Sequence, residues 1–157
     1  MSSKIIHETS GFPTAFPILL IFQSAVACFI LTKEHESPWI AISITAPLIL
    51  LFLSSRLRIT MHPEYFEYYF FPFMFRRKKV QWNEIREIRL VNTDPVWDFG
   101  GWGVRLSKKY GKAFITGGNE TLFLLLKNGK RRTFSIKSKI TVKNFFDEHV
   151  IAYEESP

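Results

Sequence analysis

The sequence predicts a membrane-anchored protein, in which an N-terminal transmembrane α-hairpin precedes a mainly-β barrel or sandwich of about seven strands, capped by a C-terminal α-helix. Two uncharged apolar runs near the N-terminus indicate the hairpin. Apolar and polar residues alternate from residue 57 onward, which is typical of half-buried strands. Apolar residues recur at helical spacing near the C-terminus. We therefore divide the chain into an N-terminal tail and anchor over residues 1–55 and a barrel domain over residues 56–157.

The anchor consists of two apolar runs, over residues 12–32 and 38–55, neither of which contains a charged residue. A helix of about 20 residues crosses a hydrocarbon core of about 30 Å, and the first run has that length. The second run is shorter, and slight thinning of the bilayer would accommodate it. We expect both runs to span the membrane. Two alternatives are disfavoured. A lipoprotein signal ending at Cys28 is disfavoured because apolar residues continue past the cysteine. A buried hairpin of a soluble protein is disfavoured because two uncharged runs of this length would need a large core around them.

The basic residues that flank the runs predict the orientation of the anchor. Arg56 and Arg58 follow the second run directly, whereas the loop between the runs carries one basic residue, Lys33. The positive-inside rule therefore predicts a multi-pass protein of the cell membrane with both termini in the cytoplasm. Cys28 is the one cysteine of the chain, so an intrachain disulfide is excluded.

The domain behind the anchor carries the basic charge of the chain. Residues 56–157 contain 19 of the 21 Lys and Arg residues and 11 of the 14 Asp and Glu residues. A basic surface beside a bilayer is typical of contact with anionic lipid headgroups. Nucleic acid is the other usual partner of a basic domain. We do not expect nucleic acid here, because the anchor holds the domain at a membrane.

Short strands and one helix account for most of the domain. Strands are predicted over residues 57–61, 65–70, 73–80, 85–91, 104–106, 112–116, 122–126 and 131–137. Asn128 and Gly129 form the tip of the clearest hairpin, since a type I′ turn requires positive φ angles. A helix follows over about residues 141–153, with Thr141 as its N-cap. Its predicted apolar face consists of Val142, Phe145, Phe146, His149, Val150 and Tyr153.

Three segments of the domain carry a resemblance to a known family. They are GGWGVR at residues 100–105, GKAF at 111–114 with GN at 118–119, and LLLKNGKR at 124–131. Together they resemble bacterial membrane proteins that have two N-terminal membrane helices and then a pleckstrin-homology-like (PH-like) domain. The resemblance covers nearly the whole chain and implies a PH-like barrel capped by a C-terminal helix. It implies an architecture and no activity, because the molecular role of that family is largely undefined.

Two basic clusters and one loop are the candidate contact surfaces. The first cluster, at residues 76–79, follows an aromatic run and either contacts headgroups or is a solvated strand face. The second, at residues 127–132, is either a phosphate site or a solvated turn. The loop over residues 92–102 contains Trp97 and Trp102, and these side chains suit a protein contact. For lipid or partner contact we single out Arg76, Arg77, Lys78, Lys79, Trp97, Trp102, Lys130 and Arg131.

The sequence does not indicate an enzyme, a cofactor or a metal site. The glycine-rich stretch at residues 98–103 runs into a predicted strand, whereas a phosphate-binding loop runs into a helix. The histidines, His7, His35, His62 and His149, do not pair with one another or with cysteine at metal-ligand spacing.

Two functions remain open on the sequence. The first is an interaction module that binds a protein partner or anionic lipid at the cytoplasmic face of the membrane. The alternative is an assembly or accessory subunit of a larger membrane complex, with contacts made through the transmembrane helices. Small residues at Ser24, Ala25 and Ala27 would permit close helix packing. No oligomeric state is predicted.

Overall fold

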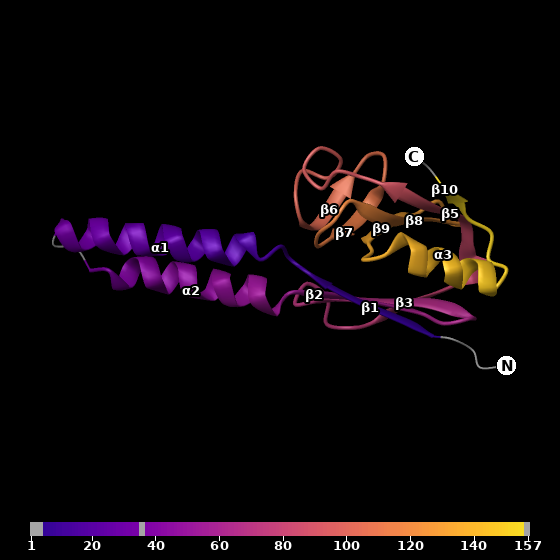
Figure 1. Cartoon of the computed structure of the whole chain (residues 1–157), viewed down its shortest axis with the longest axis horizontal. Helices are drawn as coiled ribbons and strands as arrows, with labels where there is room; N and C mark the ends of the chain where they lie inside the picture. The colour runs from indigo at the N-terminus through magenta and orange to yellow at the C-terminus, as the bar shows by residue number, and fades with distance from the viewer. Residues whose placement is uncertain (1–4, 35–36, 156–157) are drawn as a thin grey trace. The chain divides into compact units, whose positions relative to one another are not determined.

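The structure is a computed structural model that describes residues 5–34 and 37–155 (Figure 1). The chain divides into two compact units. Residues 12–55 make up a helical unit, and residues 1–11 together with residues 56–157 make up a β unit.

The helical unit is an antiparallel pair of apolar helices, α1 (Ala15–Lys33) and α2 (Trp39–Ser54). Phe16 near the start of α1 stacks on Phe52 near the end of α2, with ring centroids 5.5 Å apart. Among the described residues, α1 is long and apolar enough to cross a membrane, with a mean hydropathy of 2.2. The helix α2 is also apolar, but its 16 residues are fewer than a typical span. The two predicted apolar runs therefore form one helix of spanning length and a shorter one.

The β unit begins before the helices and not after them. Strand β1 (Ile6–Gly11) pairs antiparallel with β2 (Arg56–Met61), so that Ile6 lies opposite Met61 and Gly11 lies opposite Arg56. The helical unit is thus an insertion in the connection between two neighbouring strands. The predicted boundary after residue 55 was wrong for residues 6–11, which were assigned to an N-terminal tail. A six-residue strand with a buried glutamate, Glu8, has too little apolar alternation to be recognised.

The first sheet of the β unit is an antiparallel meander in the order β1-β2-β3-β4. Strand β3 covers Tyr65–Phe71 and β4 covers Lys78–Gln81. The strand predicted over residues 73–80 is therefore wrong over most of its length. Residues 72–77 form the β3–β4 turn, in which the backbone N–H of Met74 donates to the carbonyl of Phe70 at 2.7 Å.

The second sheet has the order β10-β5-β8-β9-β7-β6. Its strands are β5 (Ile85–Asn92), β6 (Gly103–Ser107), β7 (Gly111–Ile115), β8 (Glu120–Leu126), β9 (Arg131–Ser135) and β10 (Glu154–Glu155). Strands β5, β8 and β9 are antiparallel neighbours, and the β6–β7 hairpin joins β9 through a parallel β7–β9 pair. The described residues thus form ten strands in two sheets. The sequence predicted about seven strands in a barrel or sandwich, and the resemblance implied one barrel.

An aromatic core fills the space between the two sheets. Phe66, Tyr68 and Phe70 alternate along β3 and are at most 1% exposed. The strand predicted over residues 65–70 therefore forms, and this face of it is the buried one. Tyr68 packs on Phe134 of β9 with ring centroids 4.7 Å apart, and Phe134 stacks on Phe114 of β7 at 5.2 Å. Buried aromatic pairs of this kind stabilise a core beyond their area alone. The inner faces of the two sheets are held together by these rings.

Helix α3 (Lys139–Glu148) packs its apolar face on the domain. Val142, Phe145 and Phe146 are buried, as predicted, and Trp82 of the short 3₁₀ helix η1 (Trp82–Glu84) meets the ring of Phe146 at 5.7 Å. Burial of this stripe fixes α3 against the segment that links the two sheets.

Both predicted ends of the terminal helix need correction. Ser138 is the N-cap, because its hydroxyl accepts from the backbone N–H of Thr141 at 3.2 Å. At the other end, Val150 has a positive φ of 55° and is 91% exposed. The backbone N–H of Ile151 then donates to the carbonyl of Phe146 at 2.9 Å, which satisfies the end of the helix. The helix therefore stops at Glu148 and not at residue 153.

Candidate functional site

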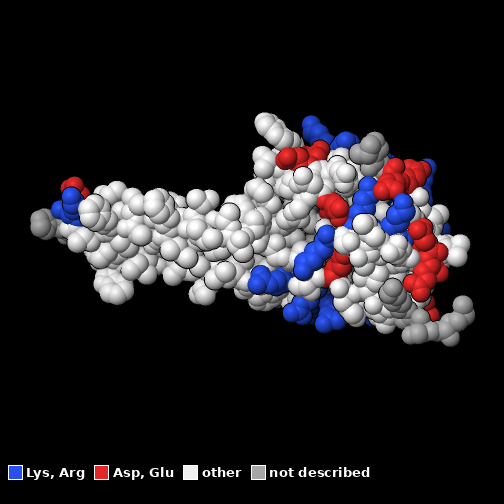
Figure 2. Space-filling view, viewed as in Figure 1, with Lys and Arg blue, Asp and Glu red and all other residues white. Residues whose placement is uncertain are grey.

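The outer face of the β1–β4 sheet is polar and carries a shallow cavity of about 580 Å³. It is formed by side chains that alternate with those of the aromatic core. They include His7, Arg58, Tyr65, Glu67, Arg77 and Lys79. Figure 2 shows that Lys and Arg side chains gather on the β unit, whereas the helical unit is almost uncharged apart from its loop end. This outer face therefore contains two members of the first basic cluster, Arg77 and Lys79.

Glu67 organises the cations of this face. Its Oε1 lies 3.1 Å from Nη1 of Arg77, and its Oε2 lies 3.7 Å from Nζ of Lys79. Lys79 also lies over the ring of Tyr65, 4.5 Å from its centroid. Because Arg77 and Lys79 are mostly exposed, these ion pairs orient the cations more than they stabilise the fold. Arg76 and Lys78, the other two members of the cluster, are exposed as well.

The aromatic run before this cluster is split between core and surface. Phe70 is buried in the core, while Phe73 is 47% exposed and Phe75 is 88% exposed in the β3–β4 turn. An exposed ring directly before Arg76 has the composition of a segment that enters the headgroup region. Phe70 therefore belongs to the core, whereas Phe73 and Phe75 belong to the surface.

The second basic cluster meets the first across a groove of about 480 Å³. Lys127, Lys130 and Arg132 line this groove from the β8–β9 hairpin, and Lys79 lines it from β4. The predicted residue Arg131 points elsewhere, since its Nη1 donates to the carbonyls of Lys108 and Lys109 at 3.1 and 3.4 Å. Successive side chains of a strand point to opposite faces, so Arg131 and Arg132 of β9 cannot both face the groove. This alternation is the sequence signal that favours one of them over the other.

Arg132, which sequence reasoning left out of the singled-out residues, is the most enclosed cation of the groove. Its guanidinium lies over the ring of Tyr68, 5.7 Å from the centroid. Within the described part of the chain, neither Nε of Arg132 nor the hydroxyl of Tyr68 makes a hydrogen bond, and both atoms are buried. Burial raises the pKa of the Tyr68 hydroxyl, and the charge of Arg132 opposes that rise.

The tryptophan loop separates its two tryptophans. Trp102 packs against a second apolar cluster on the outer face of the β5–β10 sheet, which includes Phe99 and Tyr110. Trp97 is 89% exposed. Oδ1 of Asp94 accepts from the backbone N–H of Trp97 at 3.0 Å, so an ordered turn presents this side chain to solvent. Of the two tryptophans, Trp97 is therefore the one whose side chain is accessible to a partner.

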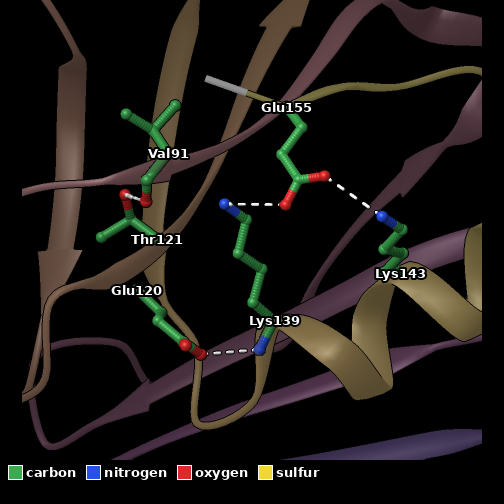
Figure 3. A network of polar contacts seen from close by, with 6 residues as sticks. All are labelled: Val91, Glu120, Thr121, Lys139, Lys143 and Glu155. Atoms are coloured by element: carbon green, nitrogen blue, oxygen red, sulfur yellow. Dashed lines mark hydrogen bonds and ion pairs between the residues drawn. The ribbon is translucent and has the colours of Figure 1, made fainter. Parts of the chain in front are cut away.

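A polar network ties the C-terminal segment to the sheet (Figure 3). The backbone N–H of Lys139 donates to Oε2 of Glu120 at 2.6 Å, and its Nζ lies 3.0 Å from Oε1 of Glu155. Lys143 pairs with the other oxygen of Glu155 at 3.2 Å. Lys139 and Lys143 together lower the pKa of the Glu155 carboxyl. These contacts join β8, α3 and β10.

The described residues contain no group of three His, Cys, Asp or Glu side chains placed to hold a metal ion. His35 lies outside the described residues. The positively charged groove and outer face are suited instead to binding anions.

The sequence matches no protein-family model, and no match to it was found among curated proteins. The resemblance to PH-like membrane proteins therefore stays a prediction, and the site is interpreted from its own geometry.

Proposed function

We propose that this protein is a membrane-anchored interaction module. The helices α1 and α2 form a two-span anchor in the cell membrane. The β unit is a PH-like domain that binds a protein partner or anionic lipid headgroups at the cytoplasmic face. The observation that carries this proposal is the insertion of an apolar helical hairpin between two paired strands of a basic domain.

The β1–β2 pairing supports two spans over one. Gly11 precedes α1, Arg56 follows α2, and the two lie opposite each other in one sheet. The chain must therefore enter and leave the bilayer on the same side. If α1 crosses, α2 has to cross back. The 16 residues of α2 reach roughly 24 Å, so a modest thinning of the bilayer accompanies this crossing.

The architecture of the β unit supports the PH-like part of the proposal. Two sheets pack face to face on an aromatic core, and the terminal helix α3 packs on the segment that links them. The helix packed on the strands is a feature that the resemblance also implies, whereas the two separate sheets stand in place of one barrel.

The distribution of cations supports contact with a negatively charged surface. Arg58, Arg77 and Lys79 surround the outer cavity, and Phe75 and Arg76 project from the neighbouring turn. Each Lys or Arg close to an anionic bilayer contributes about 1 kcal/mol. The same cations would serve an acidic protein surface.

One observation favours the alternative, an assembly subunit that makes its contacts through the helices. A shallow groove of about 360 Å³ runs along the α1–α2 pair and is lined by small and branched residues, among them Ser24, Ala25 and Ala46. The hydroxyls of Ser24 and Thr45 are 2.9 Å apart across the pair. A further helix packs readily against such a surface.

The topology is tested by labelling single cysteines in intact cells with a membrane-impermeant maleimide. In a Cys28→Ser background, Ser37→Cys probes the loop between the helices and Asn128→Cys probes the β8–β9 tip. We expect the first position to react in intact cells and the second only after the membrane is opened. Labelling of both positions from the same side would contradict the two-span anchor.

A further inference from the structure

The groove between β4 and the β8–β9 hairpin has more positive than negative side chains in its lining. Four cationic side chains line it, namely Lys79, Lys127, Lys130 and Arg132. Glu84 is the one carboxylate of the lining, and its Oε2 already accepts from the backbone N–H of Gln81 at 3.1 Å. The carboxylate caps η1, and it offsets only one of the four positive charges of the lining.

The position of Arg132 adds an argument that is independent of surface charge. Its Nε is buried without a hydrogen bond in the described part of the chain, beside the equally unpaired and buried hydroxyl of Tyr68. No carboxylate of the described residues lies within ion-pair distance of its guanidinium. Arg132 is half-buried, and an anion that reaches its Nε would satisfy a buried donor that has no acceptor among the described residues.

We propose that this groove binds a phosphate monoester group. The planar guanidinium of Arg132 suits two oxygens of such a group, and Lys127 and Lys130 supply the point charges that balance its second negative charge. A cavity of about 480 Å³ is within the size range of small-ligand sites. The amides of Asn83 and Asn128 line the same groove and provide further donors.

This site is distinct from the outer face of the β1–β4 sheet, with which it shares one lining side chain, Lys79. Its chemistry does not depend on where α1 and α2 lie. The phosphate monoester belongs either to a soluble metabolite or to a lipid headgroup such as phosphatidate, and the two sources are separated by experiment.

The soluble source is tested with the full-length protein in nanodiscs of neutral lipid, titrated with glycerol 3-phosphate by calorimetry. The lipid source is tested with the detergent-solubilised protein, by native mass spectrometry in an equal mixture of phosphatidate and phosphatidylglycerol. We expect saturable binding of glycerol 3-phosphate, or retention of phosphatidate over phosphatidylglycerol. Absence of both would overturn the site, whereas the cysteine-labelling experiment on the anchor would be unaffected.

The residues are tested by charge removal. Arg132→Gln is expected to weaken binding at least about tenfold, since it removes a charge-assisted contact. The double variant Lys127→Gln, Lys130→Gln is expected to do the same, and both of its positions are exposed, so it decides the question if Arg132→Gln fails to fold. Lys108→Gln, an exposed lysine outside the groove, is the matched control. An equal loss in the control would reduce the effect to general electrostatics and overturn the site.

Discussion

At the residue scale, Glu8 of β1 is a carboxyl that is buried where this strand joins the sheet. Its Oε2 accepts from the backbone N–H of Lys137 at 3.1 Å, and the residue is 9% exposed. Burial raises the pKa of this carboxyl above its ordinary value of 4.5, although hydrogen bonds from the backbone of Lys137 and Ser138 oppose the rise. The folded state therefore holds the proton more tightly than the unfolded state does.

The pH dependence of stability follows from that difference. The free energy of unfolding falls as the pH rises from 4.5 through the raised folded-state pKa of Glu8. We expect Glu8→Gln, which keeps an acceptor oxygen and cannot ionise, to raise the unfolding temperature at pH 7 and to match wild type below pH 4.5. Thermal unfolding of the detergent-solubilised protein over a pH series measures this. Glu64→Gln, at an exposed position, is the control and should show no such crossover.

Two glycines with positive φ angles differ in the space available for a side chain, so substitutions there distinguish backbone strain from a steric clash. Gly111 and Gly129 both have positive φ angles, of 70° and 78°. A Cβ at Gly111 would lie 2.5 Å from the carbonyl oxygen of Arg131, whereas a Cβ at Gly129 would meet nothing within 4 Å. We expect Gly129→Ala to cost about 1 kcal/mol of unfolding free energy and Gly111→Ala to cost clearly more. Chemical denaturation of the two variants gives the comparison, and equal losses would contradict the close approach.

The two tryptophans of the loop over residues 93–102 should differ in their effect on the free energy of unfolding. Trp102 packs on an apolar cluster, so Trp102→Ala is expected to lower the unfolding free energy by about 2 kcal/mol. Trp97 is 89% exposed, so Trp97→Ala should change stability by less than about 0.5 kcal/mol. If a protein partner binds here, only Trp97→Ala should weaken that complex while leaving the fold intact.

At the element scale, the helical hairpin behaves as a replaceable connection. Because Gly11 and Arg56 are opposite each other in the sheet, a short Asn-Gly turn in place of residues 12–55 should give a folded, water-soluble β unit. Its comparison partner, residues 56–157 alone, lacks β1 and leaves the edge of β2 unpaired. We expect a cooperative unfolding transition for the first variant and a destabilised, aggregation-prone product for the second. Equal stability of the two would show that β1 is dispensable.

At the scale of the whole molecule, the proposed anchor and the basic β unit together predict binding to anionic membranes. The soluble β unit just described should co-sediment with anionic vesicles and not with neutral ones, and salt should weaken this binding. Replacing Arg58, Arg76 and Lys78 by Gln leaves Glu67 its two partners, and is expected to reduce the affinity at low salt on the order of a hundredfold. The control replaces Arg86, Arg105 and Lys108, which are also exposed, by Gln. No binding at low salt would contradict lipid contact and favour a protein partner.

The sequence by itself determined the features that depend on local periodicity. Uncharged runs identified α1 and α2, because a long apolar helix is recognisable from composition. Alternation predicted the strand that carries Phe66, Tyr68 and Phe70, and helical spacing predicted the apolar face on which Val142 and Phe145 are buried. These patterns are recognisable because a strand buries every second side chain and a helix buries one stripe, whatever their partners.

Only the tertiary structure decided which distant segments meet. It joined β1 to β2 across the whole helical hairpin, and it brought Lys79 beside Arg132 in one groove. It also turned Arg131 away from that groove and separated Trp97 from Trp102. Strand pairing and side-chain direction at a sheet edge depend on contacts between residues far apart in the chain. Local patterns of charge and hydrophobicity therefore identified the clusters, and the packing of the two sheets decided which of their members share a site.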